Sequence, residues 1–61
     1  MVGMIKVGSK VKYIGADMVA MKKDKIYEVL DIKHHTYKIM TEIEETYYIP
    51  EKYFEEVKDE L

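Results

Sequence analysis

The chain contains no cysteine, no tryptophan and no arginine, and its 61 residues include a single proline. Without cysteine it can form neither a disulfide framework nor a zinc ribbon, and it has no thiol nucleophile. No stretch approaches the roughly 20 consecutive apolar residues of a membrane-spanning helix. The first residues also lack the charged start and long apolar stretch of a signal peptide. We therefore expect a cytoplasmic protein that does not enter a membrane.

Apolar residues make up 48% of the chain, and the net charge is −2, which favours folding over disorder. A chain of this length buries about 60% of its unfolded surface, enough for one thin core. We predict a single domain over residues 1–61, with little room for a catalytic cleft.

Charge is unevenly distributed along the chain. Residues 1–38 hold eight lysines and four acids (net +4), whereas residues 39–61 hold two lysines and eight acids (net −6). Either the halves interleave and the dipole partly cancels, or a bipolar surface favours head-to-tail contact or a charged partner.

Short apolar runs separated by polar turns predict strands rather than helices. The expected strands span residues 10–14, 25–32, 36–40 and 46–49. In the first, Val11 and Tyr13 should face inward; in the second, Tyr27 and Val29 share one face. Residues 16–24 are expected to form a loop anchored by the adaptable side chain of Met21.

The last segment, residues 50–61, allows two interpretations. Tyr53, Phe54, Val57 and Leu61 have the spacing of an amphipathic helix, and Pro50 could occupy its first position. The alternative is a short 3₁₀ turn at residues 51–53, followed by a strand at residues 54–57.

Apolar residues on both faces of several short strands indicate a small antiparallel sheet that curls on itself. We therefore predict an all-β fold, a five-stranded SH3-like barrel with a short 3₁₀ turn before the last strand. The predicted core consists of Val7, Val11, Met21, Tyr27, Val29, Tyr37, Ile39, Ile49, Phe54 and Val57.

The segment of residues 48–57 (YIPEKYFEEV) resembles the closing motif of SH3 domains, in which Pro-x-x-Tyr precedes an apolar core residue. That resemblance implies the 3₁₀ turn and final strand rather than the helix. Residues 21–30 also look like the SH3 diverging turn and second strand, with Asp24 where glycine is usual. The resemblance covers roughly residues 7–57.

The chain is closer still to a group of small stand-alone SH3-like barrel proteins of bacteria and their prophages. Three motifs carry this similarity: VGSKVKYIG at residues 7–15, KDKIYEV at residues 23–29, and YIPEKYFEEV at residues 48–57. The resemblance implies a fold and no particular biological task.

Three residues match positions that line the SH3 groove for proline-rich peptides, namely Tyr13, Pro50 and Tyr53. The groove's usual tryptophan would fall near His35 or Thr36, where this chain has none. Since that tryptophan separates the ridges on which a polyproline helix sits, the resemblance does not imply ordinary proline-rich recognition.

Two clusters with possible metal or catalytic chemistry are better explained as surface turns. His34 and His35 would point to opposite faces of a strand, so they are poorly placed to hold one metal. Glu42, Glu44 and Glu45 form an acidic turn that we expect to be solvated. With no nucleophile–base pair in the chain, we predict no catalytic residues, no metal site and no cofactor.

A basic face offers an alternative function. Nucleic-acid binding at such a face is weakened by the lack of arginine, whose planar fork makes the best phosphate and guanine contacts. The acidic second half would also repel a nucleic-acid backbone. The lysines concerned are Lys10, Lys12, Lys22, Lys23 and Lys25.

The sequence thus predicts a non-enzymatic interaction module that binds a protein segment or a second copy of itself. The predicted binding residues are Tyr13, Tyr48, Pro50 and Tyr53, with backbone pairing at strand edges as a further contribution. Weak nucleic-acid binding through the lysine-rich face is the alternative.

Overall fold

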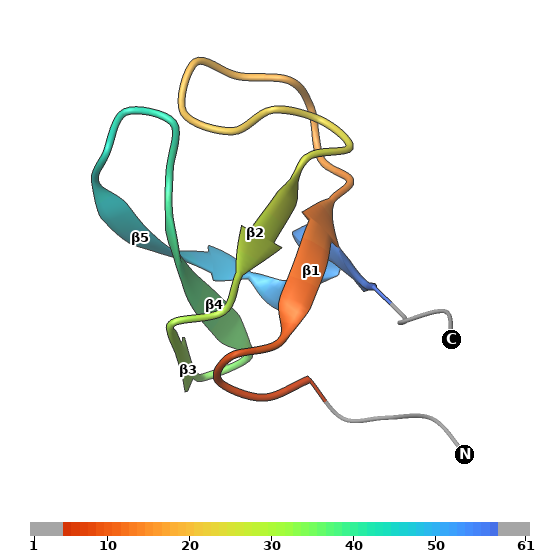
Figure 1. The fold of residues 1–61 in the computed structure, drawn as a ribbon, viewed down its shortest axis with the longest axis vertical. Helices are drawn as coiled ribbons and strands as arrows, with labels where there is room; N and C mark the ends of the chain where they lie inside the picture. Colours follow the sequence, from red (N-terminus) through yellow and green to blue (C-terminus); the bar gives the residue numbers. More distant parts are fainter. Residues whose placement is uncertain (1–4, 58–61) are drawn as a thin grey trace.

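A computed structural model describes residues 5–57 and consists of two three-stranded antiparallel sheets (Figure 1). One sheet has the order β2-β1-β6 and the other the order β3-β4-β5. The elements are β1 (Lys10–Tyr13), β2 (Ile26–Glu28), β3 (Asp31–Lys33), β4 (Thr36–Met40), β5 (Thr46–Pro50), the 3₁₀ turn η1 (Glu51–Tyr53) and β6 (Phe54–Glu56).

The all-β prediction is confirmed, and so is the 3₁₀ turn before the last strand. The helical interpretation of residues 50–61 is wrong over the part that the structure describes, because β6 occupies its middle. Pro50 is the last residue of β5, and η1 begins directly after it. Within residues 5–57 no helix has the length and apolar character needed to cross a membrane.

The predicted strand at residues 25–32 forms two strands, which serve different sheets. The Val29 N–H donates to the carbonyl of Ser9 at 2.9 Å, whereas the Leu30 N–H donates to the carbonyl of Lys38 at 2.8 Å. Because Asp31 already pairs with Lys38, Leu30 is an extra residue that bends the strand, as in a β-bulge. One continuous stretch of chain thus connects the two sheets.

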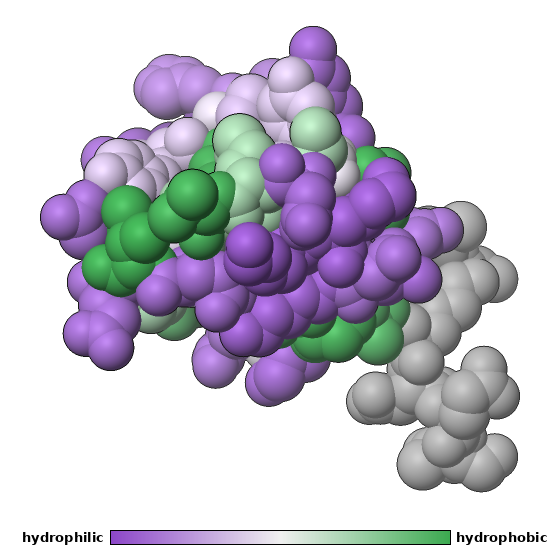
Figure 2. Space-filling model, turned by 90° about the horizontal axis from the view of Figure 1, so that it is seen from above, coloured by the Kyte–Doolittle hydropathy of each residue, from purple (hydrophilic) through white to green (hydrophobic). Residues whose placement is uncertain are grey.

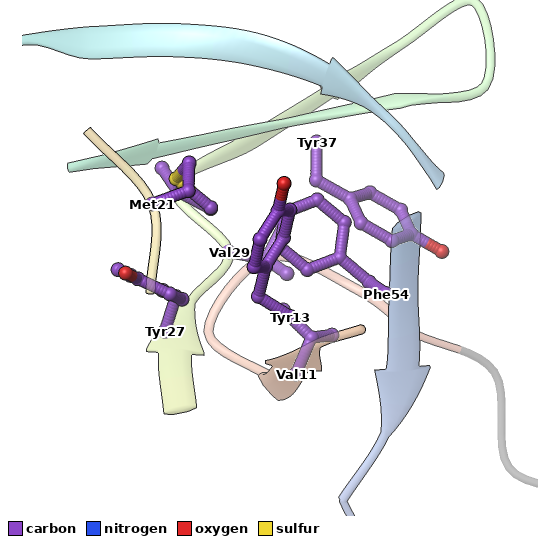
Figure 3. Packing of buried hydrophobic residues seen from close by; sticks show 8 residues of the cluster. Val11, Tyr13, Met21, Tyr27, Val29, Tyr37 and Phe54 are labelled. Atoms are coloured by element: carbon purple, nitrogen blue, oxygen red, sulfur yellow. The ribbon is translucent and has the colours of Figure 1, made fainter. Parts of the chain in front are cut away.

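The core lies between the sheets and is rich in aromatic rings (Figure 3). The Phe54 ring contacts two tyrosines, with centroids 5.9 Å from Tyr13 and 5.7 Å from Tyr37. Seven of the predicted core residues are confirmed, and Tyr13 joins them. The buried set is Val11, Tyr13, Met21, Tyr27, Val29, Tyr37, Ile39 and Phe54.

The prediction that Val7 belongs to the core is wrong, since its side chain is 59% exposed. The Ser9 N–H donates to the carbonyl of Lys6 at 2.9 Å, and Gly8 has a φ of 96°. These features define a turn with Val7 at its corner, where the side chain points outward. Ile5 packs against the core instead.

Two other predicted core residues are only half-buried. Ile49 packs against the buried cluster from β5. Val57 follows β6, where its N–H donates to the carbonyl of Lys10. Both belong to the rim of the core.

The hairpin between β3 and β4 turns at His34 and His35, whose φ values are 48° and 64°. Positive φ at both positions is the requirement of a tight two-residue hairpin, which asparagine and glycine satisfy with less strain. The double variant His34→Asn, His35→Gly should be more stable by about 1–2 kcal/mol. The substitution also removes the contact between His35 and Glu51, which is an ion pair only when His35 is protonated; both side chains are exposed, so the contact contributes little. Denaturant unfolding at neutral pH measures the change, and an unchanged midpoint would show that the turn is unstrained.

Candidate interaction surface at the edge of β5

Each sheet has two edge strands, and β5 differs from the other three edge strands in length and charge. The strands β2, β3 and β6 each have three residues, at least one of them charged, whereas β5 has five residues and no charge. Short length and charged side chains are the usual means by which edge strands avoid pairing with other chains. Apart from Pro50 at its end, β5 lacks this protection.

The hydrogen-bond phase of the β4–β5 ladder is fixed at its two ends. At one end the Thr41 N–H donates to the carbonyl of Glu45 at 2.9 Å, and at the other the Glu51 N–H donates to the carbonyl of His35 at 2.8 Å. Hydrogen-bonded and non-bonded pairs alternate along an antiparallel ladder. The odd-numbered residues of β5 therefore bond to β4.

The even-numbered residues of β5 direct their backbone groups away from β4. Thr46 and Tyr48 present N–H donors, and Pro50 adds a carbonyl acceptor without a donor. In the described part of the chain, no hydrogen bond engages the Thr46 or Tyr48 N–H. The outer edge of β5 is an unpaired row of two donors and three acceptors.

Side chains of β5 alternate between the two faces of the sheet. Tyr47 and Ile49 lie on the core side, and Thr46, Tyr48 and Pro50 lie on the outer side. The exposed fractions of Tyr47 and Tyr48 are 46% and 40%. An aromatic ring is thus available on each face of the open edge.

Tyr48 is held in place by the neighbouring strands of its sheet. Its hydroxyl donates to Oδ2 of Asp31 at 2.6 Å, and the Nζ atoms of Lys33 and Lys38 lie 5.5 and 5.9 Å from its ring centroid. The hydrogen bond holds the pKa of Asp31 below its usual value and raises the pKa of Tyr48. At neutral pH the ring is a neutral donor fixed on the outer face.

The other predicted binding residues have different surroundings. Tyr13 is only 3% exposed, and its hydroxyl donates to the carbonyl of Ala16 at 2.7 Å, so its ring offers no surface to a partner. Tyr53 is 38% exposed on η1, and its carbonyl accepts the Ile14 N–H. Pro50 is exposed at the end of β5. Of the four residues, Tyr48 and Pro50 share the open edge, while Tyr53 follows it in the chain.

The lysines of the predicted basic face are partly paired with carboxylates. Lys25 Nζ lies 2.6 Å from a Glu42 oxygen, and Lys12 Nζ lies 3.9 Å from a Glu55 oxygen. Lys23 Nζ donates to the carbonyl of Ile14 at 3.2 Å. Lys10 and Lys22 are exposed. Two of the five lysines therefore have a carboxylate next to them, which reduces the positive charge of this face.

The acidic turn is not fully solvated, because Glu42 connects two loops. Its Oε2 accepts hydrogen bonds from the Tyr27 hydroxyl at 2.9 Å and from Lys25. Its backbone N–H donates to the carbonyl of Ala20. Glu44 and Glu45 are exposed as expected. Nothing in the sequence distinguishes Glu42 from Glu44 and Glu45, so its contacts with the other loop could not be predicted.

The loops joined in this way also expose apolar side chains. Met18 and Val19 precede Ala20, and Ile43 follows Glu42; all three are exposed. Figure 2 looks onto this loop end and shows green areas within a mostly hydrophilic surface. These side chains form a second apolar region at the surface, without the aligned backbone donors of the β5 edge.

Residues 5–57 contain no candidate metal site. In that range no group of three or more histidine, aspartate or glutamate side chains is placed to hold a metal ion. A hollow of about 430 Å³ is lined by Gly8, Ser9, Lys10, Glu56 and Val57. This lining offers one lysine and one carboxylate, whereas the β5 edge offers an ordered row of donors and acceptors.

Comparison with protein-family models, with curated proteins and with solved structures gave no match.

Proposed function

We propose that the chain is a non-enzymatic interaction module, built on a small SH3-like barrel, that binds an extended protein segment along the outer edge of β5. Such a segment would add a strand to the sheet β3-β4-β5. Main-chain hydrogen bonds would supply affinity, and contacts with Tyr47 and Tyr48 would supply selectivity.

The unpaired backbone row of β5 is the observation that carries this proposal. Two N–H groups with the spacing of a ladder face outward on a strand without charge, next to exposed rings on both faces. The barrel assignment is supported by the continuous chain from β2 into β3 and by η1 immediately before the last strand. The position of η1 before the last strand is the arrangement that the resemblance to SH3 domains implies.

Nucleic-acid binding is less well supported, because Lys12 and Lys25 are already paired with Glu55 and Glu42. Titration with single-stranded DNA at low salt should leave the amide signals of residues 10–25 unchanged. A shift that added salt reverses would instead favour the lysine-rich face, since phosphate contacts are salt-dependent.

The proposal is tested by partner capture with a matched pair of variants. Tyr48→Lys places a charge on the open edge, and Ile26→Lys places the same charge on a residue of similar exposure in β2, at the edge of the other sheet. The wild-type chain and Ile26→Lys should capture the same proteins from the cells in which the chain is made, whereas Tyr48→Lys should lose them. Equal capture by all three chains would overturn the proposal.

A further inference from the structure

We infer that the segment accepted by β5 is the β5 strand of a second copy of the chain, paired antiparallel about a two-fold axis at Tyr48. This inference rests on the function proposed above and specifies its partner. The result would be one sheet with the order β3-β4-β5-β5-β4-β3 across the two copies.

The backbone groups of the edge are self-complementary in this register. Tyr48 faces Tyr48 of the second copy, so each N–H meets the other's carbonyl. Thr46 faces Pro50 of the second copy, so the Thr46 N–H meets the Pro50 carbonyl. All four outward donors of the two strands are then paired. Because Pro50 has no N–H, the Thr46 carbonyl opposite it stays unpaired. No N–H donor of the two strands is left without a partner.

The side chains also suit pairing with a copy. On the core side, Tyr47 lies opposite Ile49 of the second strand, and this occurs twice. Aromatic and β-branched residues are a favourable cross-strand combination. On the outer side the two Tyr48 rings meet at the axis. Neither strand carries a charge, and the nearest like charges are Glu45 of one copy and Glu51 of the other, which lie opposite each other just beyond the strand ends.

The acids next to β5 are held by their own chain. Glu51 contacts His35 at 3.2 Å, and the Tyr37 hydroxyl donates to it at 3.5 Å. The Tyr47 hydroxyl donates to Glu45 at 2.5 Å. These contacts hold Glu45 and Glu51 to groups of the same chain instead of leaving them free beside the axis.

The adjacent register, with Tyr47 on the axis, pairs the same donors but has poorer side-chain contacts. There Ile49 faces the charged Glu45 of the second copy instead of an aromatic ring. Tyr48 then faces Thr46. In one register Tyr48 lies opposite Tyr48 of the second copy, and in the other Tyr47 lies opposite Tyr47. Charged substitutions at Tyr48 distinguish the two registers.

Sedimentation of the purified chain between about 10 µM and 1 mM tests the inference, with Ile26→Lys as the matched control. The wild-type chain and Ile26→Lys should dimerise equally. Tyr48→Lys and Tyr48→Glu should each weaken dimerisation by about tenfold or more, because like charges then face each other at the axis. An equimolar mixture of these two variants should recover association, because lysine then faces glutamate.

A variant that changes only the backbone separates the role of the Tyr48 N–H from any effect of its side chain on folding. Chemical synthesis of the chain with N-methyl-Tyr48 removes the outward donor and retains the ring. N-methyl-Glu28 is the control, because the even-numbered residues of β2 face away from β1 at the edge of the other sheet. Circular dichroism should be the same for both, and only N-methyl-Tyr48 should be monomeric.

Three results would overturn the inference: a monomeric wild-type chain at about 1 mM, a dimer indifferent to the Tyr48 variants, or a lysine–glutamate mixture no more associated than its components. If the wild-type chain is monomeric while capture of another protein still depends on Tyr48, only the identity of the partner is wrong. If neither association nor capture depends on Tyr48, the proposed function fails as well.

Discussion

Replacing Phe54 with alanine is expected to unfold the domain. Phe54 is only 8% exposed, and its ring packs against Tyr13 and Tyr37 from the two sheets. Truncating a buried phenylalanine costs about 3–5 kcal/mol. A domain of this size has a total stability of about 3–9 kcal/mol, so the loss is comparable to the whole.

Val7→Ala is the matched control for this result. The apolar pattern predicts Val7 in the core, but it lies at an exposed turn corner, so its truncation should change stability by less than about 0.5 kcal/mol. Denaturant unfolding followed by circular dichroism compares the two variants with the wild-type chain. A cooperative Phe54→Ala transition with the wild-type midpoint would contradict the described core.

Tyr27→Phe should destabilise the domain by about 1–3 kcal/mol, although it removes one oxygen atom. The Tyr27 hydroxyl accepts the Lys22 N–H at 3.0 Å and donates to Glu42 at 2.9 Å. Without it, a backbone donor and a carboxylate both lose a partner. Tyr53→Phe is the control, because the hydroxyl hydrogen bonds among the described residues belong to other tyrosines.

The residues whose amide exchange accelerates in Tyr27→Phe distinguish loss of the Tyr27 hydroxyl hydrogen bonds from a general loss of packing. The Glu42 N–H bonds to Ala20, so amide exchange at Glu42 should accelerate in Tyr27→Phe even though it lies on another loop. If exchange accelerates only next to Tyr27, the two loops are not coupled through the hydroxyl.

Low pH should weaken the hydrogen bonds that Glu42 accepts from Lys25 and Tyr27. The hydrogen bond from Lys25, followed by that from Tyr27, holds the pKa of Glu42 below its usual value. A carboxylate with a lowered pKa contributes stability above the usual glutamate pKa, and this contribution is lost as the pH falls through the folded-state value. Below that pH, the difference in stability between the wild-type chain and Tyr27→Phe should become smaller, and the part due to the hydrogen bond from the Lys22 N–H should remain.

Periodicity predicts most of the fold because residues of β1, β2 and β4 alternate between buried and more exposed positions. Val11, Tyr27, Val29, Tyr37 and Ile39 can be assigned to the core in this way. Val7 cannot, because its apolar character fits a core strand and only the turn geometry at Gly8 reverses its direction. The bend at Leu30 likewise depends on pairing with β4, which no local pattern reports.

The candidate site is only partly predictable. The tyrosines around Pro50 indicate Tyr48 and Pro50 as binding residues, next to a predicted strand at residues 46–49. Whether that run lies at an edge, and which of its N–H groups face outward, depends on partners at His35 and Thr41. For Tyr13 the sequence allows either a core or a surface position, and its burial against Phe54 decides between them.

Amide hydrogen exchange along β5 tests the central claim most directly. In dilute solution the Thr46 and Tyr48 amides should exchange rapidly, while the Tyr47 and Ile49 amides, bonded to β4, should exchange slowly. At high concentration Thr46 and Tyr48 should become protected as a second strand pairs with them. Slow exchange of Thr46 and Tyr48 in dilute solution would contradict the account, because it would mean that the edge of β5 is already covered by its own chain.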